Sequence, residues 1–175
     1  NLLAAVPWTI YLSLIAFIGG AGVSLILLFL RLTSLRFAAP LVRMYVQLFQ
    51  GTPLLMQLFL VYFGLALMRF QPPPRLAASL CLSGYASAYP TETWYGCVLA
   101  VPKGQWEASS SLGLRNWHQM RLIILPQALR LSVPPTVGLM VQIVKNTSLA
   151  SIVGFVELTR ASQMIANATF EPFIA

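Results

Sequence analysis

Side chains that could perform acid–base or metal chemistry are scarce in this chain of 175 residues. Its one histidine is His118, and its four acidic residues are Glu92, Glu107, Glu157 and Glu171. No two of these glutamates are close enough in sequence to suggest a general acid and base. His118 has no histidine or cysteine partner at a metal-ligand spacing, so a solvated loop position is the simpler interpretation. Because phosphate-binding and nucleophile-elbow motifs are also missing, we expect no bond chemistry in this chain.

A polar run interrupts apolar sequence late in the chain. It begins fifteen residues after Arg130, which is ~22 Å along a helix and places it in the outer half of a bilayer. An ionisable side chain at that depth is costly, and by default it is functional. Snorkelling to the outer interface, helped by a break at Pro134-Pro135, is the alternative. The residues of the run are Lys145, Asn146, Thr147 and Ser148.

Glu92 is a second charge within apolar sequence. It lies about sixteen residues, or ~24 Å, into the third apolar run, and Pro90 leaves a nearby backbone carbonyl without its helical partner. Glu92 could be a solvated carboxylate at the membrane surface, or it could line a pathway through the membrane; both interpretations are consistent with this position. The sequence leaves both interpretations open.

One polar segment, residues 104–126, separates the third and fourth apolar runs. Helix-forming residues favour a short helix that Gly113 ends, because glycine readily takes the left-handed conformation there. Asn116 is a candidate N-cap for a second helix, with Gln119 completing an approximate capping box. We expect this second helix to end at Pro126.

Two interpretations of this helix pair are possible. An amphipathic hairpin could rest on the inner leaflet of the membrane, as basic segments with Trp and Leu often do. The sequence EASSS, however, has a small surface that buries little in lipid and lets another protein approach closely. We therefore favour a docking element for a cytoplasmic protein.

The composition is that of a membrane protein. Hydrophobic residues make up 58% of the chain and charged residues 9%, against ~25% charged in globular proteins. About 20 apolar residues in a helix cross the hydrocarbon of a bilayer. A fifth span could begin at about 170–175, which suggests a truncated C-terminus. The expected spans are residues 7–30, 44–68, 76–101 and 131–150.

Gly51, Thr52 and Pro53 predict a structural break, because proline is tolerated at a helix start and glycine before it favours a turn. We expect the break to divide an amphipathic cytoplasmic lead from the second span.

The eleven Lys and Arg residues indicate topology rather than nucleic-acid binding. They are spread through the connections between spans and not along an aromatic-rich face. Under the positive-inside rule, the connections 31–43 and 103–130 face the cytoplasm, so the N-terminus lies outside. Arg31 is expected in the first of these connections.

The segment EASSSLGLRNWHQMRLIILP resembles the EAA signature of ABC-importer permeases, in which Glu-Ala-Ala is followed at fixed distances by Gly and by Ile-x-Leu-Pro. Ser109 replaces the second alanine of the signature. The matching residues are Glu107, Ala108, Gly113, Ile123, Leu125 and Pro126. Three other stretches, YVQLFQGTPLLMQLFLVYFG, VPKGQWEA and KNTSLASIVG, resemble the permeases that import polar amino acids (the His/Glu/Gln/Arg/opine type).

This resemblance implies an all-α membrane protein with the type I ABC-importer permease fold, of which four spans are visible. It implies a permease subunit of the bacterial inner membrane that imports polar amino acids by alternating access. The implied partners are two cytoplasmic ATPase subunits, a second permease chain and an external solute-binding protein. ATP and Mg would be bound by the ATPase, and no cofactor by this chain.

The resemblance also implies roles for individual residues. The EAA segment would be a coupling helix seated in a cleft of the ATPase, with Glu107 as its polar contact. Ala108 and Ser109 would allow close approach, Gly113 would form an elbow, and Pro126 would lock the helix pair to the fourth span. Leu112 belongs to the same coupling set. The stretch from Lys145 to Ser148 would lie along the pathway and its gate.

The chain departs from the family pattern at three charged positions. Gln47 and Gln50 stand where family members have an acidic residue and an arginine, and Tyr95 stands where they tend to have arginine. Two other functions remain open from the residues alone. One is an ion-coupled secondary transporter, which usually needs buried carboxylates for the ion. The other is a membrane scaffold that recruits a cytoplasmic partner.

Overall fold

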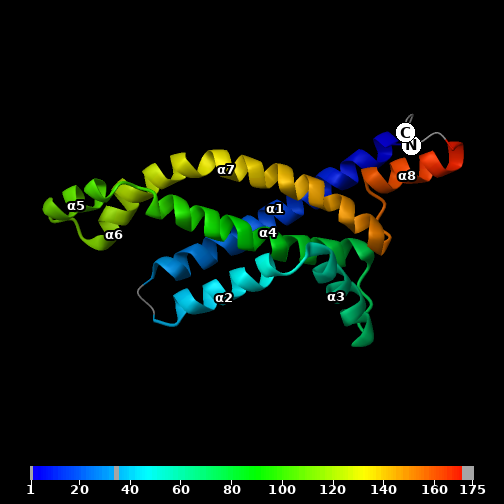
Figure 1. Ribbon diagram of the computed structural model, residues 1–175, viewed down its shortest axis with the longest axis horizontal. Coiled ribbons are helices and arrows are strands. Elements are labelled where there is room, and N and C mark those ends of the chain that lie inside the picture. Colours follow the sequence, from blue (N-terminus) through cyan, green and yellow to red (C-terminus); the bar gives the residue numbers. More distant parts are fainter. Residues whose placement is uncertain (1, 34–35, 171–175) are drawn as a thin grey trace.

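The computed structural model describes residues 2–33 and 36–170, and every regular element in these residues is helical. Its elements are α1 (Leu2–Leu32), α2 (Ala38–Gly51), α3 (Leu54–Leu67), α4 (Pro74–Leu99), α5 (Lys103–Ser111), α6 (Asn116–Gln119), the π-helical turn η1 (Met120–Ile124), α7 (Leu125–Asn146), the 3₁₀ helix η2 (Thr147–Val153) and α8 (Leu158–Thr169). Helices α1, α4 and α7 run along the long axis (Figure 1). The α5–α6 pair forms one end, and α8 lies at the other.

Small residues at every fourth position of α1 bring this helix close to α4. Ala16, Gly20 and Ser24 are buried along this stripe. A Cβ atom added to Gly20 would lie 2.6–2.8 Å from atoms of Ala86. The Ser24 hydroxyl donates a hydrogen bond of 2.6 Å to the Ser87 carbonyl. Close approach between small residues is a common way for helices to associate in lipid, where the hydrophobic effect does not drive them together.

By length and composition, two stretches of the described residues could cross a membrane, α1 and the helical run Asn116–Val153. The bent pair α2–α3 is a third candidate if it counts as one span. The third span expected from the sequence coincides with α4, but this helix is not apolar enough to be among the candidates. The reason is its central position. Because α4 contacts α1, α2, α3 and α7, small and polar side chains that face protein replace apolar ones that face lipid.

The residues of the expected second span, 44–68, form two helices with a break between them. Helix α2 ends at Gly51 and α3 begins at Leu54, and the two helices are bent by 98°. The break predicted at Gly51-Thr52-Pro53 is present. It is sharper than expected, and α3 leaves the long axis of the molecule (Figure 1).

Gln57 holds this bend, a role that the sequence analysis missed. Its Nε2 donates hydrogen bonds to the carbonyls of Phe49, at 2.8 Å, and Thr52, at 3.0 Å. In a continuous helix the amide of residue 53 would bond the Phe49 carbonyl, but Pro53 has no N–H. The side chain of Gln57 therefore supplies the donor that the backbone lacks.

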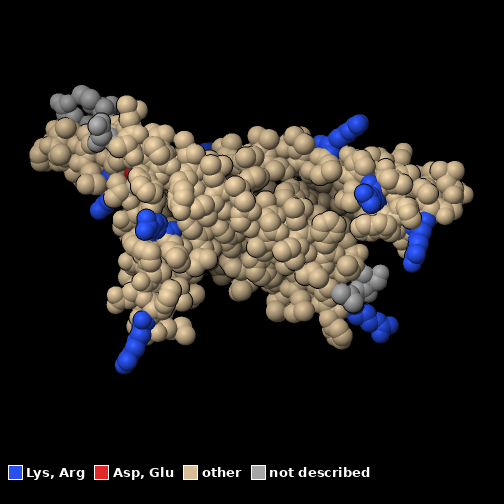
Figure 2. All heavy atoms as spheres, turned by 180° about the vertical axis from the view of Figure 1, so that it is seen from behind, with Lys and Arg blue, Asp and Glu red and all other residues tan. Residues whose placement is uncertain are grey.

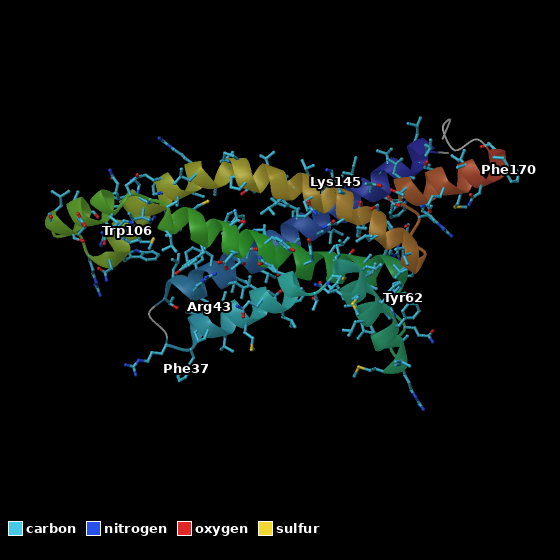
Figure 3. The ribbon with its side chains drawn as sticks, in the orientation of Figure 1. Phe37, Arg43, Tyr62, Trp106, Lys145 and Phe170 are labelled. Carbon is cyan, nitrogen blue, oxygen red and sulfur yellow. The ribbon has the colours of Figure 1, made fainter. Side chains whose placement is uncertain are left out.

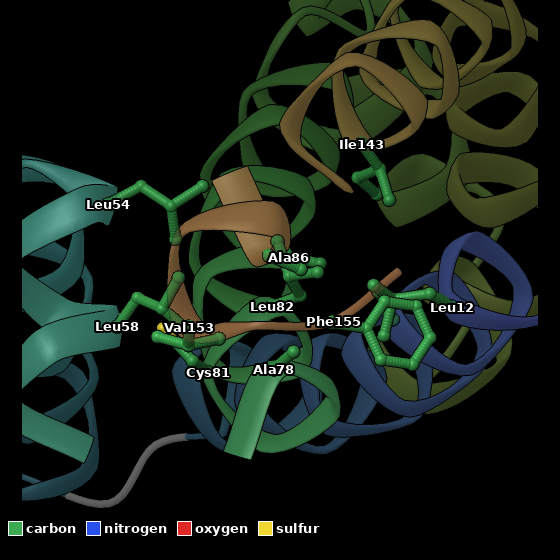
Figure 4. Packing of buried hydrophobic residues seen from close by; sticks show 12 residues of the cluster. Leu12, Leu54, Leu58, Ala78, Cys81, Leu82, Ala86, Ile143, Val153 and Phe155 are labelled. Carbon is green, nitrogen blue, oxygen red and sulfur yellow. The ribbon is translucent and has the colours of Figure 1, made fainter. Parts of the chain in front are cut away.

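The main hydrophobic core lies where α3, the end of α7 and η2 meet α4 (Figure 4). Leu54 and Leu58 enter it from α3, and Val153 from η2. Phe155 follows η2 and packs edge-on against Trp8 of α1, with 6.2 Å between ring centres. This core fixes the turn that comes directly after the Lys145 run.

Helix α8 was not expected from the sequence, because it is short and amphipathic. Glu157 caps it, with its carboxylate accepting hydrogen bonds from the amides of Thr159, at 2.9 Å, and Arg160, at 2.8 Å. An acidic group at a helix start also interacts favourably with the helix dipole. The possible fifth span at about 170–175 falls on residues 171–175, which lie outside the described residues.

Positive charge gathers toward the extremities of the molecule. Figure 2 shows Lys and Arg side chains near both ends of one face and on its protruding part, whereas the broad middle carries almost none. A charge-poor band between basic ends is the surface that a bilayer requires.

Candidate functional site

Helix α5 lies at one end of the molecule, against α6 and the π-helical turn η1 (Figure 1). Val98 and Val101 form a small buried cluster there with Ile124 and Ala128. Trp106 packs against this cluster from the inner face of α5 (Figure 3). The aromatic side chain thereby anchors α5 to both long helices.

The outer face of α5 is open. Glu107 and Ala108 are exposed, and Leu112 directly after the helix is 76% exposed. Residues 108 and 112 lie one turn apart, so their side chains share a face. Among the described residues the Glu107 carboxylate has no ion-pair partner. A free carboxylate beside small and apolar side chains is a surface that a partner protein can cover.

Ser109 is placed differently from its expected role. Its side chain is buried, with 1% of the residue exposed, and its hydroxyl donates to the carbonyls of Gln105, at 2.7 Å, and Trp106, at 2.9 Å. A residue that faces the interior leaves no surface for a docked protein. Ser109 belongs to the joint inside the helix pair.

Gln119 occupies the other side of this joint. It is 6% exposed, and its Nε2 donates to the Trp106 carbonyl at 2.7 Å and to the Ser109 hydroxyl at 2.6 Å. The capping box expected from Asn116 and Gln119 does not form, because α6 has no side-chain cap. Gln119 instead satisfies buried groups of α5, a contact between elements that no sequence pattern indicated.

Gly113 forms the elbow, as expected. It takes a left-handed conformation with φ of 71°. Its amide donates to the Ser110 carbonyl at 2.9 Å, and the Leu114 amide donates to the Ser109 carbonyl at 3.3 Å. These two bonds make the Schellman arrangement that ends a helix on a glycine.

From α6 onward the chain is one helical run as far as Val153. Pro126 does not end this run; it lies directly after the π-helical turn η1, at the second residue of α7, where the regular helical hydrogen-bond pattern is already interrupted. The break expected at Pro134-Pro135 is also absent, and both prolines lie inside α7. The elbow is therefore connected without interruption to the Lys145 region.

Lys145 is exposed in the last turn of α7, far along the molecule from Trp106 (Figure 3). Thr147 is buried, and its hydroxyl donates to the Val144 carbonyl at 2.8 Å. Asn146 and Ser148 are partly buried. Lys145 is thus the most exposed member of this polar run.

Glu92 is paired with Arg31 of α1. One guanidinium nitrogen bonds Oε2, and the other donates to Oε1 at 3.3 Å. The Arg31 side chain is only 8% exposed, and its guanidinium carbon lies 3.7 Å from the ring centre of Tyr95. The expectation that Arg31 lies in a connecting loop is wrong, because α1 extends to Leu32.

The structure does not bring Glu92 and Lys145 together. Trp94 of α4 donates a hydrogen bond of 2.9 Å to Thr136 of α7, which fixes the register of these two helices. Lys145 lies nine residues beyond Thr136, so the two charged residues differ by ~10 Å along the bundle axis.

The described residues hold no cluster of three His, Cys, Asp or Glu side chains that could bind a metal ion. His118 is exposed on α6.

Comparison with known proteins assigns the chain to a family. Residues 20–175 match the family described as "Binding-protein-dependent transport system inner membrane component". The chain is 31% identical to the "Probable amino-acid ABC transporter permease protein YckA" of Bacillus subtilis, over 95% of the chain and 74% of that protein. It is 36% identical to the "Nopaline transport system permease protein NocM" of Agrobacterium fabrum, over 98% of the chain and 76% of that protein.

A solved structure described as "Crystal structure of an amino acid ABC transporter with histidines" superimposes on the chain with a TM-score of 0.93 at 30% identity, over 98% of this chain and 80% of the other. The chain thus belongs to the family of binding-protein-dependent transport system inner membrane components, and it is a multi-pass inner-membrane permease of the amino-acid ABC importer type, whose ATPase is a separate subunit.

Proposed function

We propose that this chain forms half of the pathway by which a polar amino acid enters a bacterial cell. It does so with a second permease chain, two cytoplasmic ATPase subunits and an external solute-binding protein. ATP and Mg are bound by the ATPase subunits. The N-terminus faces outward, and α4 crosses the membrane as the central helix of four spans. Relatives named for nopaline and a structure described with histidines support the choice of a polar amino acid.

The observation that carries this proposal is the exposed outer face of α5, next to a turn that side-chain contacts hold in place. Glu107 provides a charge, Ala108 allows close approach and Leu112 provides apolar area for a cleft in the ATPase. The same face lies at the end of the molecule that the positive-inside rule assigns to the cytoplasm.

Coupling follows from the continuity of the helical run. Closure of the two ATPase subunits would move α5, and the elbow would pass this movement to α6. Helix α7 has 22 residues and is ~33 Å long, so a small tilt at its cytoplasmic end displaces its far end. Rigid movement of packed helices is a common way to open one side of a pathway and close the other.

Lys145 is our candidate for the charged residue of the pathway, with Asn146, Thr147 and Ser148 shaping the turn behind it. The exposed ammonium could meet the carboxylate that every amino acid carries. We assign Glu92 to helix packing rather than to the pathway, because Arg31 already satisfies it.

Reconstituted transport tests the proposal. The complete permease is placed in vesicles with its candidate ATPase and binding protein, and uptake of labelled amino acids is measured with and without ATP. We expect Glu107→Ala to abolish most ATP-dependent uptake, whereas Lys103→Ala, an exposed change on the same helix, should retain it. We expect Lys145→Met to lose uptake while the ATPase still binds.

Other outcomes identify the competing functions. Uptake driven by an ion gradient in the absence of ATP would indicate a secondary transporter. ATPase binding without any uptake would indicate a scaffold. Full uptake by the Glu107→Ala variant would show that the open face of α5 is not the coupling surface.

A further inference from the structure

The link between α5 and α6 is weak along the chain itself. Residues 112–115 connect the two helices, and their turn depends on the left-handed conformation of Gly113. A short connection around glycine bends easily, because glycine has the widest range of backbone conformations. A force applied to α5 would be lost at this elbow unless side chains hold the two helices together.

Gln119 supplies the most buried of these side-chain contacts. Its amide nitrogen reaches α5 at three points, the Trp106 carbonyl and the hydroxyls of Ser109 and Ser110, the last at 3.3 Å. Hydrogen bonds that are shielded from water are stronger than exposed ones, and leaving such groups unsatisfied is costly.

A second glutamine provides a natural comparison. Gln127 of α7 donates to the side-chain oxygen of Gln105 at 3.2 Å, but this bond is exposed. Water competes for exposed bonds, so this contact contributes less to holding α5. The two glutamines thus connect α5 to the same helical run in different environments.

We propose that Gln119 is a positioning residue for coupling, which fixes the angle between α5 and α6 so that movement of α5 reaches α7. This inference rests on the proposed function of the α5 face. Ser109, which stands in the place of an alanine in the EAA signature, takes part as the hydroxyl partner of Gln119. Both residues are buried within the helix pair, so neither belongs to the exposed face of α5.

The first test compares uptake with ATP hydrolysis in the reconstituted complex. Gln119→Leu removes the donor at similar volume, and Gln127→Leu is the matched control. We expect Gln119→Leu to assemble with the ATPase and to hydrolyse ATP, but to move several-fold less amino acid per ATP. The control should keep the wild-type ratio. An unchanged ratio in Gln119→Leu would overturn the proposal.

A second test measures the angle itself. Spin labels at Lys103→Cys and His118→Cys, both exposed, report the distance between α5 and α6 once Cys81 and Cys97 are replaced by alanine. We expect a narrow distance distribution in the assembled permease and a broad one after Gln119→Leu. A distribution that stays narrow would show that other contacts set the angle.

A milder variant covers the case in which Gln119→Leu does not assemble. Ser109→Ala removes one acceptor and keeps the Trp106 carbonyl, so we expect a partial loss of transport per ATP. A wild-type ratio in this variant would then count against the role of the Gln119 bonds.

The Glu107→Ala variant separates the two proposals. Normal transport by Glu107→Ala, together with a broader spin-label distance distribution in Gln119→Leu, would show that the α5 face is not the coupling surface. It would also show that the Gln119 contacts nevertheless set the angle between α5 and α6.

Discussion

The guanidinium of Arg31 holds the carboxylate of Glu92 and rests on the ring of Tyr95, and so fixes the end of α1 to α4. Tyr95 stands where family members tend to have arginine. In this chain α1 supplies the positive charge, and the tyrosine ring supports it by a cation–π contact. The resemblance to the family suggested a loss of charge at this position, whereas the structure shows a charge that comes from another helix.

Replacing Glu92 with glutamine should therefore destabilise the bundle. Arg31 would stay buried without a compensating charge, and breaking a buried pair in this way costs several kcal/mol. Because the Glu92 side chain is 45% exposed, we expect roughly 2 kcal/mol of unfolding free energy to be lost. Denaturant unfolding in detergent, followed by tryptophan fluorescence, measures this loss. Arg43→Gln removes an exposed charge and serves as the control, and equal stability of both variants would contradict the prediction.

Gly20 should not tolerate even alanine. The added Cβ would collide with Ala86 at 2.6 Å and push α1 away from α4, at a cost of about 1–3 kcal/mol. Gly22 lies two residues further along α1, and a Cβ there meets no atom within 4 Å. Gly22→Ala should be neutral or gain up to about 1 kcal/mol from helix propensity. Thermal unfolding of the two variants in the same detergent gives the comparison, and similar midpoints would refute close packing at Gly20.

Gln57→Leu should loosen the bend between α2 and α3. The part-buried Phe49 carbonyl would lose its donor at a cost of about 1 kcal/mol, whereas water can replace the donor at the exposed Thr52 carbonyl. Amide hydrogen exchange should then rise in the first turn of α3. Gln47→Leu, an exposed change on α2, should leave exchange in α3 as it was. Unchanged protection in Gln57→Leu would mean that the side chain does not hold the bend.

Gly113→Ala should strain the elbow. A residue with a Cβ at φ of 71° costs about 1–2 kcal/mol, so the helix pair would shift toward other turn conformations. We expect weaker ATPase binding, measured by titration of the purified subunit against the detergent-solubilised permease. Gly104→Ala is the control, because Gly104 lies within α5 and its added Cβ would meet open space. Wild-type affinity in Gly113→Ala would show that the elbow adapts without loss.

The sequence predicted the features that depend on local chemistry. Gly113 was recognised as a turn because few other residues take its backbone conformation. The segment Gly51-Thr52-Pro53 was recognised as a break because proline is tolerated at a helix start and glycine before it favours a turn. The open face of Glu107 and Ala108 followed from a motif whose residue types and spacing are specific. Each of these signals lies within a few residues of the feature that it predicts.

Contacts between residues that are far apart in the sequence could not be predicted in this way. The role of Gln119 depends on the two helices folding back on each other, and its spacing from Asn116 suggested a local cap instead. Arg31 was expected in a loop, because its partner Glu92 is 61 positions away and the local sequence does not show that the two side chains pair. Ser109 was predicted to belong to the contact surface because it is small, but the size of a side chain does not show whether it faces the surface or the interior.

The sequence by itself determined that this chain resides in a membrane, where its candidate docking segment lies and where several of its helices can turn. Hydropathy, charge and proline or glycine positions decide these features through interactions with solvent and with the nearest backbone. The tertiary structure alone decided that α4 is the central helix, that α2 and α3 stand at 98°, and that Gln119 and Arg31 join separate helices. These features depend on which groups a buried polar side chain can reach, and only packing brings those groups within hydrogen-bonding distance.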